Sequence, residues 1–218
     1  MMTVKSDSKA LLRAILAQDI GAVRACLADH PETWSDLAEL SDKSRRSPLW
    51  LALAFGKVQA ANLLAQNGAV FSANENLEML AYGAGASGSV DSVLFLLDGH
   101  VAGAALGLDA GVSLDLDANI MAFRRSALGG ATLEAQSETV LEIVQRFGWA
   151  VAPEIRHWAF SMALKLTPEA RAALGADPNE ALPDSKPYQA DAQRLWQIAR
   201  SWRSVRDALN KTIESAKA

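Results

Sequence analysis

The chain has 218 residues, 50% of them apolar, and a formal charge of −4 at pH 7. This length allows a sizeable core, while the acidic balance gives no overall attraction to the phosphates of nucleic acid. Cys26 is the only cysteine, which excludes an intrachain disulfide and a thiolate-rich metal site. We therefore expect a protein of a reducing compartment with no nucleic acid partner.

We expect no secretory signal peptide at the start of the given sequence. Residues 1–9 are polar and lack the apolar run of a signal peptide. No stretch approaches the roughly 20 apolar residues that a helix needs to cross a bilayer. The sequence therefore predicts a cytoplasmic protein with no membrane partner.

Alanine and leucine are frequent throughout, and apolar residues recur at spacings of three and four. This periodicity predicts an all-α fold. The short helices are separated by glycine or by clusters of Asn, Asp, Ser and Pro, which favours helix pairs stacked in a row. Residues 10–27 predict the first pair, and His30-Pro31 ends it.

The clearest repeat unit lies between residues 47 and 70. Ser47 suits a helix N-cap and Pro48 the first helical position, where the N–H that proline lacks has no partner anyway. Gly56 permits a turn between two helices, and Gly68 suits the left-handed position that commonly ends a helix. The apolar members of the unit predict a stripe that neighbouring repeats cover: Leu49, Ala52, Leu63 and Leu64.

This unit resembles an ankyrin repeat, whose pattern is Thr-Pro-Leu-His-x-Ala, a glycine, a pair of leucines and Gly-Ala. Weaker units follow near residues 80–99, 124–148 and 153–175, so the resemblance covers residues 9–148 and extends loosely to 175. It implies an ankyrin-like solenoid of stacked helix-turn-helix repeats, which presents a surface to protein partners. Trp50 replaces the family's histidine, whose side chain braces neighbouring turns. The indole either packs in the core or is exposed as an anchor for a partner.

Residues 99–122 are longer than the usual link between repeats. They form either an extra short helix or an extended loop, and long ordered loops are often where scaffolds bind. Asp115, Asp117 and Asn119 have the oxygen spacing that opens a calcium loop, but Ser126 stands where such a loop needs glutamate. We therefore expect a solvated acidic segment.

The proline-rich residues 177–187 predict a linker between the repeat domain, residues 1–176, and a C-terminal helix in residues 188–218. Apolar residues at spacings of three and four give this helix one apolar face, with arginines largely on the other. We expect it to cap the last repeat, and the alternative is a partner-binding or dimerising helix. The apolar positions are Leu195, Ile198, Trp202, Val205, Leu209 and Ile213, and the arginines are Arg194, Arg200, Arg203 and Arg206.

The residues that could carry chemistry form no specific pattern. Gly83 to Gly88 match a dinucleotide-binding Gly-x-Gly-x-x-Gly loop, but their surroundings are helical and we expect close helix packing instead. The three histidines are far apart, and no zinc-binding or nucleophile motif occurs. We predict no cofactor, no metal and no enzymatic activity.

Two basic stretches, Lys43 to Arg46 and Arg124-Arg125, precede the first helices of two repeats at equivalent positions. They are either ordinary solvated loop charges or a basic patch that suits an acidic protein partner. The predicted partner-binding residues are Lys43, Arg45, Arg46, Trp50, Asp115, Asp117, Arg124 and Arg125.

The leading hypothesis is a non-catalytic protein-protein interaction module, and its narrower form is an immunity or inhibitor protein that binds a cognate partner. One alternative is an enzyme whose site lies in residues 99–122. Another is a structural protein that self-associates through the final helix. The sequence leaves the partner's identity and the oligomeric state open.

Overall fold

The computed structural model describes residues 4–29, 38–39, 45–69, 71, 75–101, 116–147, 165–175 and 189–215. Most of these residues are helical, so the predicted all-α class is confirmed. In this part of the chain, β structure is confined to the antiparallel pairing of β1 (Ala38–Glu39) with β2 (Arg45–Arg46). None of the described helices is both long and apolar enough to cross a membrane.

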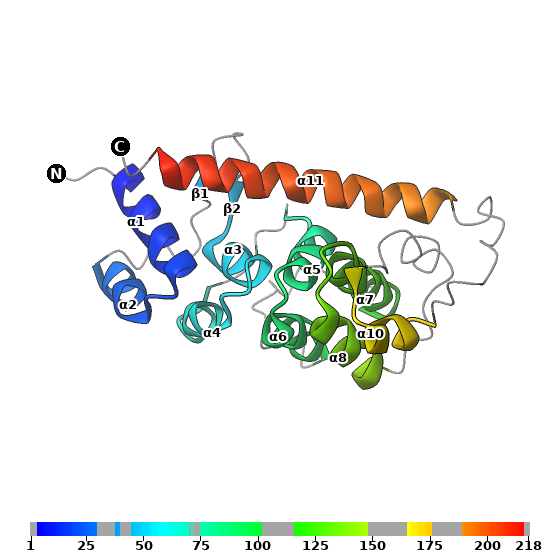
Figure 1. The fold of residues 1–218 in the computed structure, drawn as a ribbon. Helices are drawn as coiled ribbons and strands as arrows, with labels where there is room; N and C mark the ends of the chain where they lie inside the picture. The colour runs from blue at the N-terminus through cyan, green and yellow to red at the C-terminus, as the bar shows by residue number, and fades with distance from the viewer. Residues whose placement is uncertain are drawn as a thin grey trace.

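Eight helices form four consecutive pairs that lie side by side in a row (Figure 1). The first helix of each pair contacts the first helix of the next, and the second helices do the same. A further helix, α10 (Pro168–Ala173), packs on α8 at the end of the row, and Thr167 caps it as its sequence predicts. The pairs are α1 (Val4–Ala17) with α2 (Ile20–Asp29), α3 (Pro48–Ala54) with α4 (Val58–Gln66), α5 (Leu77–Ala86) with α6 (Val90–Val101), and α7 (Leu116–Leu133) with α8 (Ser137–Phe147).

All four pairs turn in the same way. A residue with positive φ lies one or two positions after the end of the first helix, and one further residue precedes the second helix. The N–H groups of Lys57 and Gln136, which follow two of these residues, each donate to an alanine carbonyl oxygen at 2.7 Å. Glycine suits this conformation best, yet two of the four turns lack it. The four residues are Gln18, Gly56, Gly88 and Ala135.

The start of α3 is held by side chains, as the sequence predicts. The hydroxyl of Ser47 accepts a hydrogen bond from the Trp50 N–H at 3.2 Å, and Pro48 occupies the first turn. The N–H and hydroxyl of Ser47 donate to the buried carboxylate of Glu75, at 2.5 and 2.9 Å. This contact ties the N-terminus of α3 to the segment that leads into α5.

The start of α7 differs from the prediction. Ser126 stands as far before Ala135 as Ser47 does before Gly56, so the two units are in register, yet α7 begins at Leu116. Pro48 prevents an extension of α3 because proline disfavours helical geometry in the residue before it. Ala127 takes the place of that proline in α7, and the helix continues upstream through Arg124 and Arg125. The predicted irregular segment 99–122 is therefore helical up to Val101 and again from Leu116, and residues 102–115 lie outside the described part.

Glycines bring the backbones of α5 and α7 into contact. A Cβ atom on Gly85 would lie 1.9 Å from the carbonyl oxygen of Ala127, and one on Gly130 would lie 2.1 Å from that of Tyr82. Gly83 and Gly85 lie inside α5 and do not follow a strand. The Gly-x-Gly-x-x-Gly stretch therefore serves close helix packing, as expected.

The long helix α11 (Gln189–Glu214) lies across the first helices of the pairs (Figure 1). It contacts α5 and α7, and Trp202 reaches Phe55 just beyond α3. The helix was expected to cap the last repeat, but it extends back over the middle of the row, where Gly83 and Gly129 leave room for its large side chains. The predicted linker, residues 177–187, lies outside the described part. The buried residues of α11 include all but one of the predicted apolar positions: Leu195, Ile198, Trp202, Val205 and Leu209.

Candidate partner-binding surface

The inner face of α11 is held by aromatic packing. The ring of Trp202 is 3% exposed, and its centroid lies 4.8 Å from that of Phe55 and 6.2 Å from that of Trp50. Gly83 of α5 lies directly against the same ring, close enough that a Cβ atom there would lie 2.7 Å from it. This cluster fixes the rotation of α11 about its axis and therefore decides which of its residues point outward.

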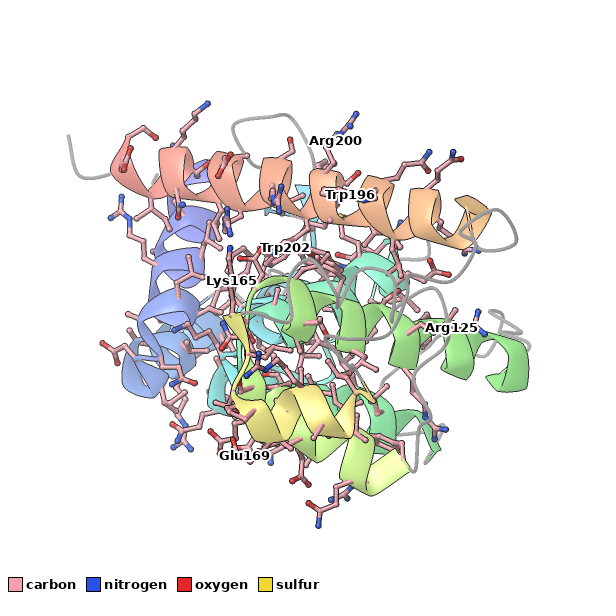
Figure 2. The ribbon with its side chains drawn as sticks, turned by 45° about the vertical axis from the view of Figure 1, so that its right-hand side comes forward. Arg125, Lys165, Glu169, Trp196, Arg200 and Trp202 are labelled. Carbon is pink, nitrogen blue, oxygen red and sulfur yellow. The ribbon has the colours of Figure 1, made fainter. Side chains whose placement is uncertain are left out.

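The outer face of α11 presents Trp196, Arg200 and Arg203, which we call the outer stripe. Their spacing of four and three residues places them on one side of the helix. Among the described residues, Trp196 is the one large apolar residue that is exposed, at 45%. Arg200 and Arg203 are exposed as well. Figure 2 shows Arg200 pointing away from the row of helices, whereas Trp202 points into it.

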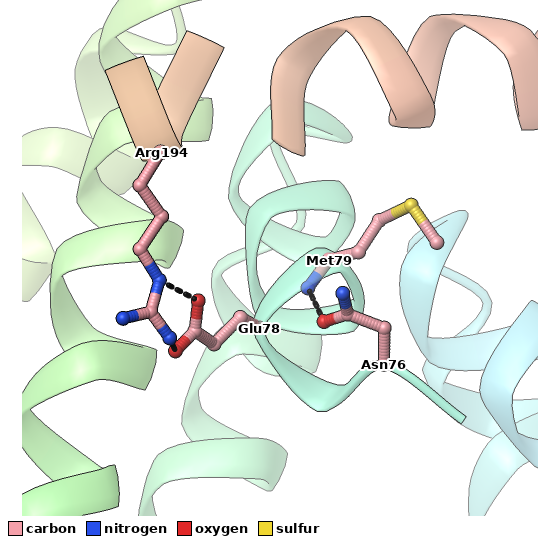
Figure 3. Close-up of polar contacts among 4 residues, drawn as sticks. All are labelled: Asn76, Glu78, Met79 and Arg194. Atoms are coloured by element: carbon pink, nitrogen blue, oxygen red, sulfur yellow. Dashed lines mark hydrogen bonds and ion pairs between the residues drawn. The ribbon is translucent and has the colours of Figure 1, made fainter. Parts of the chain in front are cut away.

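An ion pair fastens the N-terminal part of α11 to α5. The Arg194 guanidinium binds both carboxylate oxygens of Glu78, with its Nε 3.0 Å from Oε2, and the second contact runs from Nη2 to Oε1 (Figure 3). Glu78 lies in the first turn of α5, which the side chain of Asn76 caps by accepting from the Met79 N–H (Figure 3). The pair borders a small pocket of about 50 Å³ that Arg125, Leu195 and Ile198 also line.

Tyr82 lies beneath α11 in the first layer of helices. Its ring is fully buried, and its hydroxyl has no hydrogen-bond partner among the described residues. Burial raises the pKa of the Tyr82 phenol and the nearby carboxylate of Glu134 raises it further, while the charges of Arg203 and Arg206 oppose this rise. The phenol is therefore neutral at any physiological pH.

Trp50 is fully buried, so a direct role as an exposed anchor for a partner is wrong, and the core-packing alternative is confirmed. Its indole N–H donates to the carbonyl oxygen of Asn76 at 3.3 Å, which links α3 to the N-cap of α5. The Arg46 guanidinium lies over the Trp50 ring, 5.2 Å from its centroid. Trp50 and Arg46 are thus brought together as part of the packing of the chain itself.

The other predicted arginines are divided between surface and interior. Arg45 is exposed on β2. Arg124 is half-buried, with its guanidinium 4.5 Å from the centroid of the Phe147 ring, and the half-buried Arg125 lines the pocket beside Glu78. Arg124 and Arg125 were expected in a loop, and their place inside α7 is a correction that follows from the missing proline. Two basic loops at equivalent positions do not form.

Three further predicted positions lie at the start of α7 or outside the described residues. Lys43 and Asp115 lie outside the described residues. Asp117 belongs to the first turn of α7, so the acidic segment is helical from Leu116 onward, and its side chain is not described. Within the described residues, no three His, Cys, Asp or Glu side chains are grouped to hold a metal ion.

The residues of the outer stripe were not among the predicted binding residues. A signal was present in the sequence, because Trp196 does not share the spacing of three and four that links Leu195, Ile198 and Trp202. A tryptophan outside the apolar stripe of an amphipathic helix is directed toward solvent.

Searches of family models, curated proteins and solved structures find no match to this chain.

Proposed function

We propose that the protein is a non-catalytic protein-interaction module in which a row of ankyrin-like repeats supports α11, and the outer stripe of α11 binds a specific protein partner. The observation that carries this proposal is the exposure of Trp196 on a helix whose opposite face is buried. The narrower role, an immunity or inhibitor protein for a cognate partner, belongs to the same proposal.

The exposed indole favours binding for an energetic reason. Tryptophan is enriched among the residues that dominate interface energies, because its large ring excludes much water when it is covered. α11 holds this ring on a well-packed helix, so little conformational entropy remains to be lost on binding. A partner that covers Trp196 gains the burial energy without first ordering the segment that carries it.

The ankyrin-like part of the proposal is supported by the repeated turn. Four helix pairs share a left-handed residue at the same place, and the Ser47 and Ser126 units keep the same register. Such arrays hold a surface at fixed spacing along the row, which suits recognition of a folded partner. The hairpin residue Arg45 is exposed and offers a secondary contact.

Affinity capture from native lysate tests this function. The intact chain is compared with a Trp196→Ala variant, and Gln197→Ala, an exposed neighbour outside the outer stripe, is the matched control. We expect quantitative mass spectrometry to show one protein retained by the wild type and the control and lost by Trp196→Ala.

A protein retained equally by all three chains would contradict the proposed surface. Retention of no protein by any chain, with turnover of a small molecule dependent on residues 99–122, would favour the enzyme alternative. A mass that rises with concentration and falls to the monomer in Trp196→Ala would favour self-association.

A further inference from the structure

Some cations of α11 form ion pairs with carboxylates, and others do not. Arg194 pairs with Glu78, and Arg206 lies 3.7 Å from Glu134 and 3.9 Å from Asp207, an exposed carboxylate four residues after Arg203. On the outer stripe, neither Arg200 nor Arg203 forms an ion pair with any residue that the structure describes. Two cations without an ion pair among the described residues therefore lie within two helical turns of Trp196.

This local charge stands against an acidic background, since the chain has a formal charge of −4. Arg200 and Arg203 are one turn apart on the helix, and Trp196 is one turn before Arg200, so the outer stripe extends about 10 Å along the helix axis. A guanidinium presents a planar set of donors that fits a carboxylate with two parallel hydrogen bonds. The indole requires an apolar recess.

We infer that the partner's binding surface is an acidic protein segment, with carboxylates that pair with Arg200 and Arg203 beside an apolar recess that covers Trp196. This inference rests on the proposed function and names the chemistry of its partner. Nucleic acid fits the outer stripe less well, because two arginines on an acidic chain release few counterions. A membrane surface also fits less well, because the other large apolar residues described on α11 face the row of helices.

Selection from a random linear-peptide library displayed on phage, with the intact chain as bait, tests the inference. We expect enrichment of peptides that combine several carboxylates with apolar residues. For a selected peptide, Arg200→Glu/Arg203→Glu is expected to raise the Kd at least about tenfold and to reduce its dependence on salt. Lys211→Glu, an exposed cation of α11 outside the outer stripe, is the matched control and is expected to change the Kd much less.

The outcomes separate this inference from the proposed function. Selected peptides that lose binding in Trp196→Ala but carry no excess of carboxylates would overturn the acidic partner and leave the binding surface in place. Peptides indifferent to every change in the outer stripe would overturn both. A homodimer that the double charge reversal dissociates would assign the outer stripe to a second copy of the chain, which also overturns the inference.

Discussion

The two faces of α11 carry one tryptophan each, and the surroundings of the two rings are opposite. Trp202 is 3% exposed and lies between Phe55 and Gly83, whereas Trp196 is 45% exposed, about 120° around the axis of the same helix. The first ring is enclosed by the packing of the chain itself. Nearly half of the second ring is open to solvent, so the inner face of α11 serves the fold and the outer face is the one that we propose for binding.

Trp202→Ala gives the largest effect expected on stability. The substitution removes an indole from the junction of α3, α5 and α11 and leaves a cavity there, which costs about 3–5 kcal/mol. Urea denaturation followed by far-UV circular dichroism measures this loss. A loss below about 1 kcal/mol would show that α11 is not held by this ring, and the contrast between the faces would fail.

Gly83→Ala tests the same face from the side of α5. The added Cβ would lie 2.7 Å from the Trp202 ring, so the ring or α11 must shift, at an expected cost of about 1–3 kcal/mol. Gly21→Ala in α2 is the matched control, because its nearest contact is an ordinary 3.4 Å. The control is expected to be stabilising by up to about 1 kcal/mol. Equal effects of both substitutions on the free energy of unfolding would contradict the close contact with Trp202.

Tyr82→Phe is expected to be stabilising by about 1 kcal/mol at pH 7, because it removes a buried hydroxyl that has no hydrogen-bond partner among the described residues. The raised pKa of Tyr82 in the folded state means that, as the pH rises above about 10, the unfolded chain loses this proton before the folded chain does. Wild-type stability therefore falls in that range, and the advantage of Tyr82→Phe grows. A difference that stays constant from pH 7 to above pH 10, measured by urea denaturation, would show that the phenol is not buried.

Local sequence pattern predicted the helix pairs well but placed one helix start wrongly. The two basic stretches were correctly predicted at equivalent positions, because the turn residues Gly56 and Ala135 follow Ser47 and Ser126 at equal spacing. The start itself depends on a single residue: Pro48 stops α3 from extending upstream, and Ala127 does not stop α7. Arg124 and Arg125 therefore lie within a helix, whereas Arg45 and Arg46 lie on a strand.

The candidate site depended on contacts that no local pattern contains. The spacing of Leu195, Ile198 and Trp202 predicted which side of α11 is apolar, and the structure confirms it. Where that side lies on the row is decided by Gly83 and Trp202, which are remote in sequence, and only this placement turns Trp196 outward over the row. The binding prediction therefore named Trp50, which the same cluster buries.

Trp196→Ala is expected to give the smallest effect on stability and completes the comparison of the two faces. A ring that is 45% exposed contributes less to the folded state than a buried one, so the free energy of unfolding should change by no more than about 0.5 kcal/mol. The same substitution should abolish partner capture, while Trp202→Ala destabilises the whole chain. If Trp196→Ala instead cost more than about 1 kcal/mol in urea denaturation, the ring would be part of the packing of α11, and its exposure would no longer be a reason to propose a partner there.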